Sequence, residues 1–446
     1  MRTTSPGCLP LRVRALARGG SVLIIVLWIA FGLVAITLYF AHSMSLELRA
    51  SDNRFSGMAA DQAIEGVARY ICYVLANQET NGFMPDLTTY RYEEEPLGDS
   101  TFWLIGRGDR ETSPKEPIFG LVDEASKLNL NNATADMLAL LPRMTPEIAA
   151  AIVDWRDSDE TPSVNGAESQ TYALLRPPYL CKNANFDTVD ELRLVYGTTM
   201  EILLGEDLNR NGVLDANEVD EDHNGLPDPG ILEYVTVYTR EPNTRSDGTP
   251  RINVTQVAQR QALTTLLTGL FGAQRATAIV AAVPPTVRST LEFYDRSGMT
   301  AAEFGQIAND ITATNATYLV GLVNVNTASE QVLACIPGIG TDKAPLLVSA
   351  RMASADNLNS VAWVKDVLGR NGCRTAGPFL TTRSYQFSAD VAAVGPHGRG
   401  YKRTRFVIDT SDGTPTILYR QDLSHLGWAL GREVRQMQLA AQEPRR

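Results

Sequence analysis

The chain has 446 residues, of which 51 are acidic and 40 are Lys or Arg, so its formal net charge is −11. This length exceeds one average domain, and we expect two or three domains. The acidic balance argues against a general nucleic-acid binder, whereas the hydrophobic content of 44% is ordinary for a globular protein.

The first predicted element is a membrane-spanning helix at Ser21–Phe40, a run of twenty residues without a charge. At about 1.5 Å per residue such a helix covers roughly 30 Å, enough to cross a bilayer core. The preceding residues carry arginines and no acid, which predicts a cytoplasmic N-terminus and an outward bulk. An uncleaved signal anchor is one interpretation. The Gly19-Gly20 pair at the cytoplasmic edge favours a prepilin-type leader, residues 1–20, cut between Gly20 and Ser21.

The same helix is expected to continue beyond the membrane. Apolar residues recur at mostly helical spacing from Met44 to Leu75, no proline interrupts Ser21–Asn77, and Gly82 offers a stop. A helix of this length would measure roughly 85 Å. A membrane-embedded half that continues into an amphipathic half resembles the spine of type IV pilin-like proteins. Ile25 stands where most members carry Glu, a departure typical of protein K among the pseudopilins of type II secretion.

Short strands are predicted on both sides of a long helical block. They are Ser100–Gly106 and Ile118–Val122 before it, and Ser384–Val394, Lys402–Ile408 and Pro415–Tyr419 after it. This pattern predicts an α+β fold, in which a spine helix and an antiparallel sheet form one domain that a large helical domain interrupts. The predicted boundaries are 21–122 for the spine and first strands, 123–380 for the insertion, 381–432 for the last strands and 433–446 for a frayed tail.

The helical block contains an internal repeat, near 127–197 and again near 322–373. Lys127–Asn131 opens the first copy, Leu322–Asn326 opens the second, and a weaker third copy starts at Arg251–Val254. Ile336–Gly340 has the sequence of a helix-hairpin-helix turn, whose amides cradle a phosphate in DNA-binding (SAM-like) versions. The neighbouring Asp342 and the acidic block favour a compact scaffold, because phosphate binding requires several cations.

One segment of the first copy is more specific. Asp154–Asp159, Asn165–Glu168 and Pro177–Tyr179 follow one another in the order typical of protein K of type II secretion, which they closely resemble. The resemblance implies a single-pass inner-membrane minor pseudopilin with its bulk in the periplasm, which helps export folded proteins across the outer membrane. It implies proteins I and J as partners at the tip of the pseudopilus, with protein H as a further candidate, and prepilin peptidase as the processing enzyme. Secreted proteins are a further candidate partner class, and nucleic acid is not expected.

An acidic stretch, residues 206–228, predicts calcium binding. Its first half fits the ligand positions of an EF-hand loop, with Gly212 at the sharp turn and no clear helix after it. The predicted ligands are Asp207, Asn209, Asn211, the Val213 carbonyl, Asp215 and Glu218. A second, weaker loop offers Asp220, Asp222, Asn224 and Asp228, with Ile231 where the closing Glu belongs. We therefore expect one or two Ca²⁺ ions; a solvated acidic linker is the alternative.

Four cysteines lie outside the leader, on the oxidising side, where disulfides are permitted. Three pairings are open, and the short loop within the last repeat favours Cys335 with Cys373 over Cys72 with Cys181.

No enzyme is expected, since H-E-x-x-H, P-loop and G-x-S-x-G motifs are absent from the sequence. Asp154, Asp157 and Asp159 could form an acid/base set, but loop capping or a further cation site is favoured. Two other function classes stay open: an envelope-anchored helix-hairpin-helix receptor for DNA uptake, and a membrane-tethered hydrolase.

Overall fold

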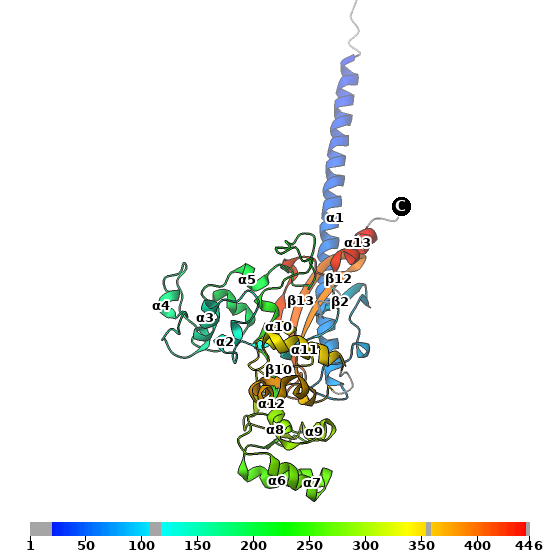
Figure 1. Ribbon diagram of the computed structural model, residues 1–446. Helices are drawn as coiled ribbons and strands as arrows, with labels where there is room; N and C mark the ends of the chain where they lie inside the picture. Colours follow the sequence, from blue (N-terminus) through cyan, green and yellow to red (C-terminus); the bar gives the residue numbers. More distant parts are fainter. Residues whose placement is uncertain (1–19, 108–116, 354–357, 443–446) are drawn as a thin grey trace, which may run out of the picture. The chain divides into compact units, whose positions relative to one another are not determined.

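A computed structural model describes residues 20–107, 117–353 and 358–442 (Figure 1). The chain forms two compact units, residues 1–56 and residues 57–446. Most of the predicted leader, residues 1–19, lies outside the described residues.

The long N-terminal helix is present as α1 (Gly20–Ala76). Its first part has apolar side chains that are mostly more than half exposed, from Val22 (63%) to Phe40 (60%). Among the described helices, α1 alone is long and apolar enough to cross a membrane, although a signal sequence near an N-terminus meets the same criterion. These features agree with a single membrane anchor.

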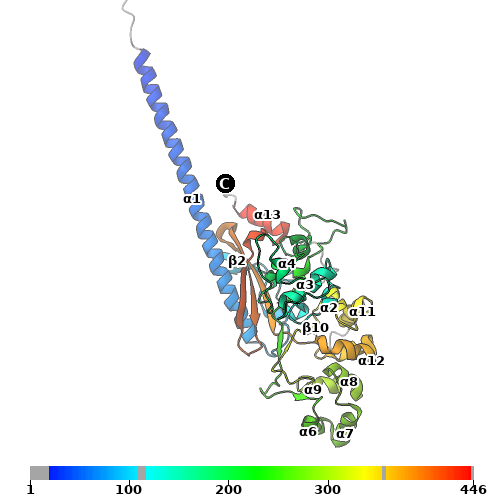
Figure 2. The same cartoon turned by 90° about the vertical axis from the view of Figure 1, so that its left-hand side faces the viewer.

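In the second unit an antiparallel sheet joins strands from both ends of the chain, as the predicted α+β fold requires (Figure 2). The strand order is β1-β2-β12-β13-β14, and β3 also pairs with β12. Their bounds are β1 Glu95–Leu97, β2 Ser100–Ile105, β3 Val122–Asp123, β12 Gln386–Gly395, β13 Arg399–Asp409 and β14 Thr416–Asp422. Leu104 of β2 pairs with Val391 of β12, so residues almost 290 positions apart are neighbours.

The two faces of this sheet have different partners because side chains alternate along a strand. Phe102 and Leu104 pack with the α1 residues from Ala60 to Leu75, and Trp103 and Ile105 pack on the opposite face with Ala429 and Leu430. The second half of α1 is therefore a core element of this unit.

The insertion consists of short helices. The α-helices of its described residues are α2 Ala135–Leu138, α3 Pro146–Arg156, α4 Ser169–Tyr172, α5 Met200–Leu204, α6 Arg260–Phe271, α7 Ala273–Ala282, α8 Thr290–Ser297, α9 Ala301–Ile307, α10 Glu330–Ala334, α11 Gly340–Ala353 and α12 Lys365–Ala376. Both views show α6, α7, α8 and α9 grouped on the side of α12. One continuous apolar core runs from Leu128 to Leu380.

Each of the three repeat copies begins with the same two-residue parallel ladder. The pairs are β4 Leu128–Asn129 with β5 Val235–Thr236, β7 Ile252–Asn253 with β8 Ile311–Thr312, and β10 Val323–Asn324 with β11 Leu380–Thr381. In each ladder an Asn side-chain oxygen accepts the N–H two residues on, at 2.8–2.9 Å; these are Asn129, Asn253 and Asn324. The third copy thus starts with the same structure as the other two. Beyond these ladders, β6 (Arg240–Pro242) pairs with β9 (Tyr318–Val320).

Three expectations are wrong. Residues 433–442 of the expected frayed tail belong to α13 (Gly431–Gln442), which is rich in helix formers and packs through Val434, whereas 443–446 lie outside the described residues. The strand expected at Ile118–Val122 shrinks to β3, because Gly120 adopts φ +146°. The cysteine pairs are not formed: Cys72, Cys181, Cys335 and Cys373 are free thiols. The Cys335 thiol turns back toward the Gln331 carbonyl of its own helix, 3.2 Å away.

Candidate metal centre

The acidic stretch is an ordered loop that closes on itself at its base. Gly205 and Pro229 form a bridge, and the N–H of Glu206 donates to the Asp228 carbonyl at 2.8 Å. A Cβ at Gly205 would lie 2.2 Å from that carbonyl oxygen, and its φ of +64° also favours glycine. The loop thus leaves and re-enters the helical core at one point.

The first predicted loop has its ligand side chains turned onto its own backbone. The two carboxylate oxygens of Asp207 accept the N–H groups of Asn211 and Gly212 at 2.9 and 2.8 Å. Asn209 and Asn211 both donate to Asp215, at 2.6 and 3.0 Å. Asp207, Asn209 and Asn211 are each at most 4% exposed. Each of these side chains can offer an oxygen atom as a metal ligand, the amides by turning their oxygen inward. Oxygen ligands fit a hard cation such as Ca²⁺.

Glu218 occupies the closing position of this loop. Its two oxygens accept the N–H groups of Asn209 and Asp215, at 3.2 and 2.9 Å. Burial raises the pKa of Glu218 to about 7, and the neighbouring Asp207 and Asp215 add to this effect. A divalent cation would stabilise the ionised form of this carboxyl.

The second loop repeats the turn of the first. The carboxylate of Asp220 accepts the N–H groups of Asn224 and Gly225 at 3.1 and 3.0 Å, as Asp207 does one loop earlier. In both loops the residue two positions before the turn glycine has a left-handed backbone conformation: Arg210 at φ 56° and His223 at φ 59°. The second loop is exposed where the first is buried.

Glu206, which sequence reasoning missed, places a carboxylate beside the second loop, whose own sequence lacks a closing Glu. Glu206 is 4% exposed, and its oxygens accept the N–H groups of Glu221 and Asp228 at 2.7 and 2.9 Å. One oxygen each of Glu206, Asp222 and Asp228 lie within 4.8 Å of one another. The position of Glu206 beside Asp207 is the one signal in the sequence; its role depends on how the loop closes.

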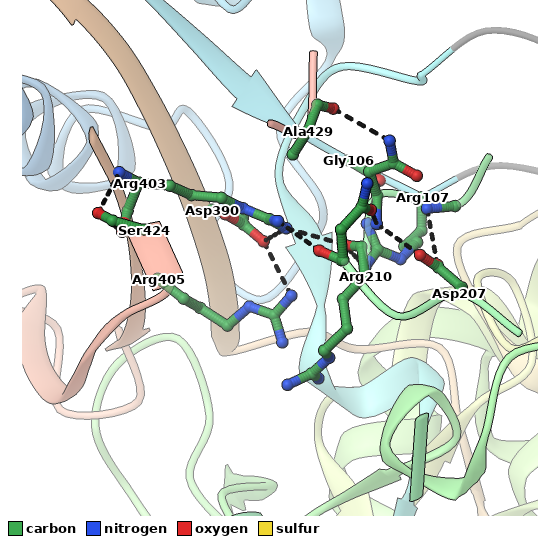
Figure 3. Close-up of polar contacts among 12 residues, drawn as sticks. Gly106, Arg107, Asp207, Arg210, Asp390, Arg403, Arg405, Ser424 and Ala429 are labelled. Atoms are coloured by element: carbon green, nitrogen blue, oxygen red, sulfur yellow. Dashed lines mark hydrogen bonds and ion pairs between the residues drawn. The ribbon is translucent and has the colours of Figure 1, made fainter. Parts of the chain in front are cut away.

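A buried charge network holds the first loop on the sheet (Figure 3). Arg403 of β13, whose side chain is fully buried, donates to the carbonyls of Asn209 and Arg210 at 2.5 and 2.8 Å. It also pairs with Asp390 of β12 at 2.7 Å. Arg107, which follows β2, donates to the Arg210 carbonyl at 2.7 Å. The loop backbone is therefore fixed by two arginine side chains, one from β13 and one from the end of β2, and Asp390 of β12 orients the first of them.

The network stabilises the charge of Asp390, whereas it disfavours the charge of Arg210. Burial alone would raise the pKa of Asp390, but the guanidinium groups of Arg403 and Arg405 outweigh it and hold that pKa well below its usual range. Burial lowers the pKa of Arg210 to about 9, and the nearby Arg405 adds to the effect. The acid at the centre is thus fully ionised at neutral pH.

A second acidic cluster lies in the protein K-like segment. Asp154, Asp157 and Glu168 each place an oxygen within 4.8 Å of the others, whereas Asp159 is not part of the cluster. Glu168 is 2% exposed, and neither of its oxygens has a hydrogen-bond partner. Burial raises the pKa of Glu168 to about 7. A Cβ at Gly166 would lie 1.9 Å from Asp154, so this glycine makes the cluster possible. The arrangement of three carboxylates suits a cation.

The helix-hairpin-helix-like turn is covered by a neighbouring helix. Gly338 adopts φ +86°, and a Cβ there would lie 2.9 Å from Thr375 of α12. The Lys343 ammonium, the cation nearest the turn in sequence, donates to the Leu368 carbonyl at 3.0 Å. The turn therefore serves packing within the last repeat.

These elements define a class of protein: a chain whose long apolar helix leads into a sheet domain, with a helical domain inserted between the strands. Residues 126–204 match the family model described as "Type II secretion system (T2SS), protein K". The resemblance expected from Asp154–Glu168 is confirmed for this segment.

Two curated relatives and one solved structure are similar to the chain. The "Type II secretion system protein K" sequences of Pectobacterium carotovorum subsp. carotovorum and Klebsiella pneumoniae are 45% and 41% identical to it over 56 residues, 13% of this chain. The chain spans 17% of the length of each of these relatives. The crystal structure of the GspK-GspI-GspJ complex from the enterotoxigenic Escherichia coli type 2 secretion system gives a TM-score of 0.39 at 12% identity, covering 87% of this chain and 99% of that one.

Proposed function

We propose that this protein is a minor pseudopilin of a type II secretion system, with the role of protein K. The match of residues 126–204 to the protein K family model carries the proposal. The membrane-length α1 and the interrupted sheet domain support it, because a pilin-like subunit needs a spine helix and a folded head. The protein acts by assembly at the tip of the pseudopilus and performs no chemistry.

The partners follow from the same role. Proteins I and J, with H as a further candidate, join it in the pseudopilus, and prepilin peptidase processes it. The name of the solved complex, in which GspK is joined to GspI and GspJ, supports the first two. The chain lies in the inner membrane with its bulk in the periplasm.

Calcium belongs to this proposal as a structural cofactor. Two Ca²⁺ ions occupy the loops of residues 206–228, one held by Asp207, Asn209, Asn211, the Val213 carbonyl, Asp215 and Glu218, the other by Asp220, Asp222, Asn224, Asp228 and Glu206. The matching turns of the two loops support both sites. The Asp154 cluster is a candidate for a further cation. The ions fix the helical domain on the sheet, since the first loop is bound to Arg403.

Leader processing tests the pilin-like class. Gly20→Ala should block cleavage before Ser21, because the peptidase must approach a backbone without a Cβ. Mass spectrometry of the N-terminus should find Ser21 first in the wild type and an intact leader in the variant, with Gly32→Ala processed normally as the control. Normal maturation of Gly20→Ala would contradict the proposal.

A further inference from the structure

A cavity of about 200 Å³ lies between the third repeat copy and the last one. Its walls come from the start of α8, the segment after α9, and the residues around β11. The polar side chains that line it include Arg251, Arg288, Ser289, Asn309, Thr312 and Arg383. The volume is below the usual range for drug-sized ligands, so the cavity suits a small ligand.

Arg383, just after β11, is the unusual group in this wall. It is 8% exposed, and within the described part of the chain no carboxylate lies within ion-pair distance of it. One nitrogen donates to the side-chain oxygen of Asn309, and the guanidinium stacks on the Phe83 ring, 3.9 Å from its centroid. The side chain of Arg383 lines the cavity.

The one acid in the cavity wall is already engaged. Glu241 pairs with Arg251 at 2.6 Å, and its second oxygen accepts the Thr381 hydroxyl at 2.8 Å. Glu292, in the first turn of α8, accepts the N–H of Arg288 at 2.9 Å and pairs with Arg296 at 3.3 Å. The charge of Arg383 therefore has no dedicated partner.

Burial without a counter-charge is costly for a guanidinium, which stays protonated in proteins. Burial lowers the pKa of Arg383, and the nearby Arg251 adds to the effect, while Tyr385 and Glu241 oppose it. The exposed Arg288 at the rim adds a second cation. An anion in the cavity would relieve this imbalance.

We infer that this cavity binds a small oxyanion, a carboxylate or a phosphate, with Arg383 as its main partner and Arg288 at its entrance. Arginine forms two parallel hydrogen bonds to either group. Gly377 shapes the wall, because a Cβ there would lie 2.2 Å from the Ser289 hydroxyl. The site is independent of the calcium loops and of the proposed place in the pseudopilus.

Calorimetric titration of the detergent-solubilised full-length protein with succinate and, separately, with phosphate tests the inference, at constant ionic strength set with chloride. We expect saturable binding of at least one anion. The anion that binds shows whether the cavity takes a carboxylate or a phosphate. Arg383→Gln should weaken binding at least tenfold, whereas Arg370→Gln, on an exposed arginine outside the cavity, should leave it unchanged.

Arg288→Gln gives a second variant, because its side chain is exposed and its loss should leave folding intact. It should reduce the affinity several-fold without changing the melting temperature in chloride. The inference would be overturned if the wild type bound neither anion. It would also be overturned if the wild type, Arg288→Gln and Arg383→Gln all bound with equal affinity.

Discussion

At the scale of single residues, the buried pair of Arg403 and Asp390 links the sheet to the first of the two loops that we propose to bind calcium. Arg403→Met removes the main partner of Asp390 and two hydrogen bonds to the loop backbone. Breaking a buried pair on one side costs about 3–5 kcal/mol, and we expect the free energy of unfolding to fall by that amount in urea titrations at pH 7. Arg91→Met, in an exposed pair with Glu95, should cost less than about 1 kcal/mol.

The same pair sets a pH dependence. The folded-state pKa of Asp390 lies below its unfolded value, so its contribution to stability is present above about pH 4 and is lost as the pH falls through the folded-state pKa. In Arg403→Met that pKa is lowered less, and acid unfolding followed by circular dichroism should begin at a higher pH. An unchanged acid transition would contradict this assignment.

The residue scale also shows what the sequence could not provide. The ligand positions from Asp207 to Glu218 follow from spacing alone, because an EF-hand loop is local in sequence. Glu206 escaped prediction because it precedes the loop that it closes. Arg403 lies between Lys402 and Arg405, two further cations of the same strand, and nothing local distinguishes a buried arginine there from an exposed one.

At the scale of elements, the two loops of residues 206–228 are the parts that calcium should order. A cation that binds only the folded loops adds RT ln(1 + [L]/Kd) to stability, which is about 2.7 kcal/mol at a free concentration one hundred times Kd. Chelation should therefore lower the melting temperature and expose Arg210, now 6% exposed, to protease. Scanning calorimetry and limited proteolysis in calcium and in chelator measure both effects.

Matched variants separate the loops. Asp207→Ala with Glu218→Ala should reproduce chelation of the first site, and Asp228→Ala should have a smaller effect because its loop is exposed. Glu206→Gln should behave like Asp228→Ala and leave the first site responsive to calcium. Identical melting of the wild type in calcium and in chelator would make the stretch a solvated linker, with the secretion role unaffected.

Elements with a strong local pattern were predicted well, and those that depend on distant packing were not. The spine helix ends one residue from its predicted end, since uninterrupted apolar spacing specifies it. The Asn-x-Asn starts of the repeats correspond to real ladders because the Asn side chain builds a local turn. The last helix was missed because its polar sequence is stabilised by contacts through Val434 with the sheet. The cysteine pairing failed because sequence distance does not give thiol direction.

At the scale of the whole molecule, we propose that the chain assembles with other minor pseudopilins. Order of the strands along the chain predicted the interruption of one domain by another, because β2 and β12 can pair only across the insertion.

Co-purification tests that claim most directly. Full-length protein, co-expressed with proteins I and J of the same secretion system and extracted in mild detergent, should elute with both in one complex of fixed stoichiometry. The major pseudopilin of that system, tagged and expressed at the same level, serves as the specificity control. Elution of the chain alone, with I and J forming a complex without it, would contradict the account.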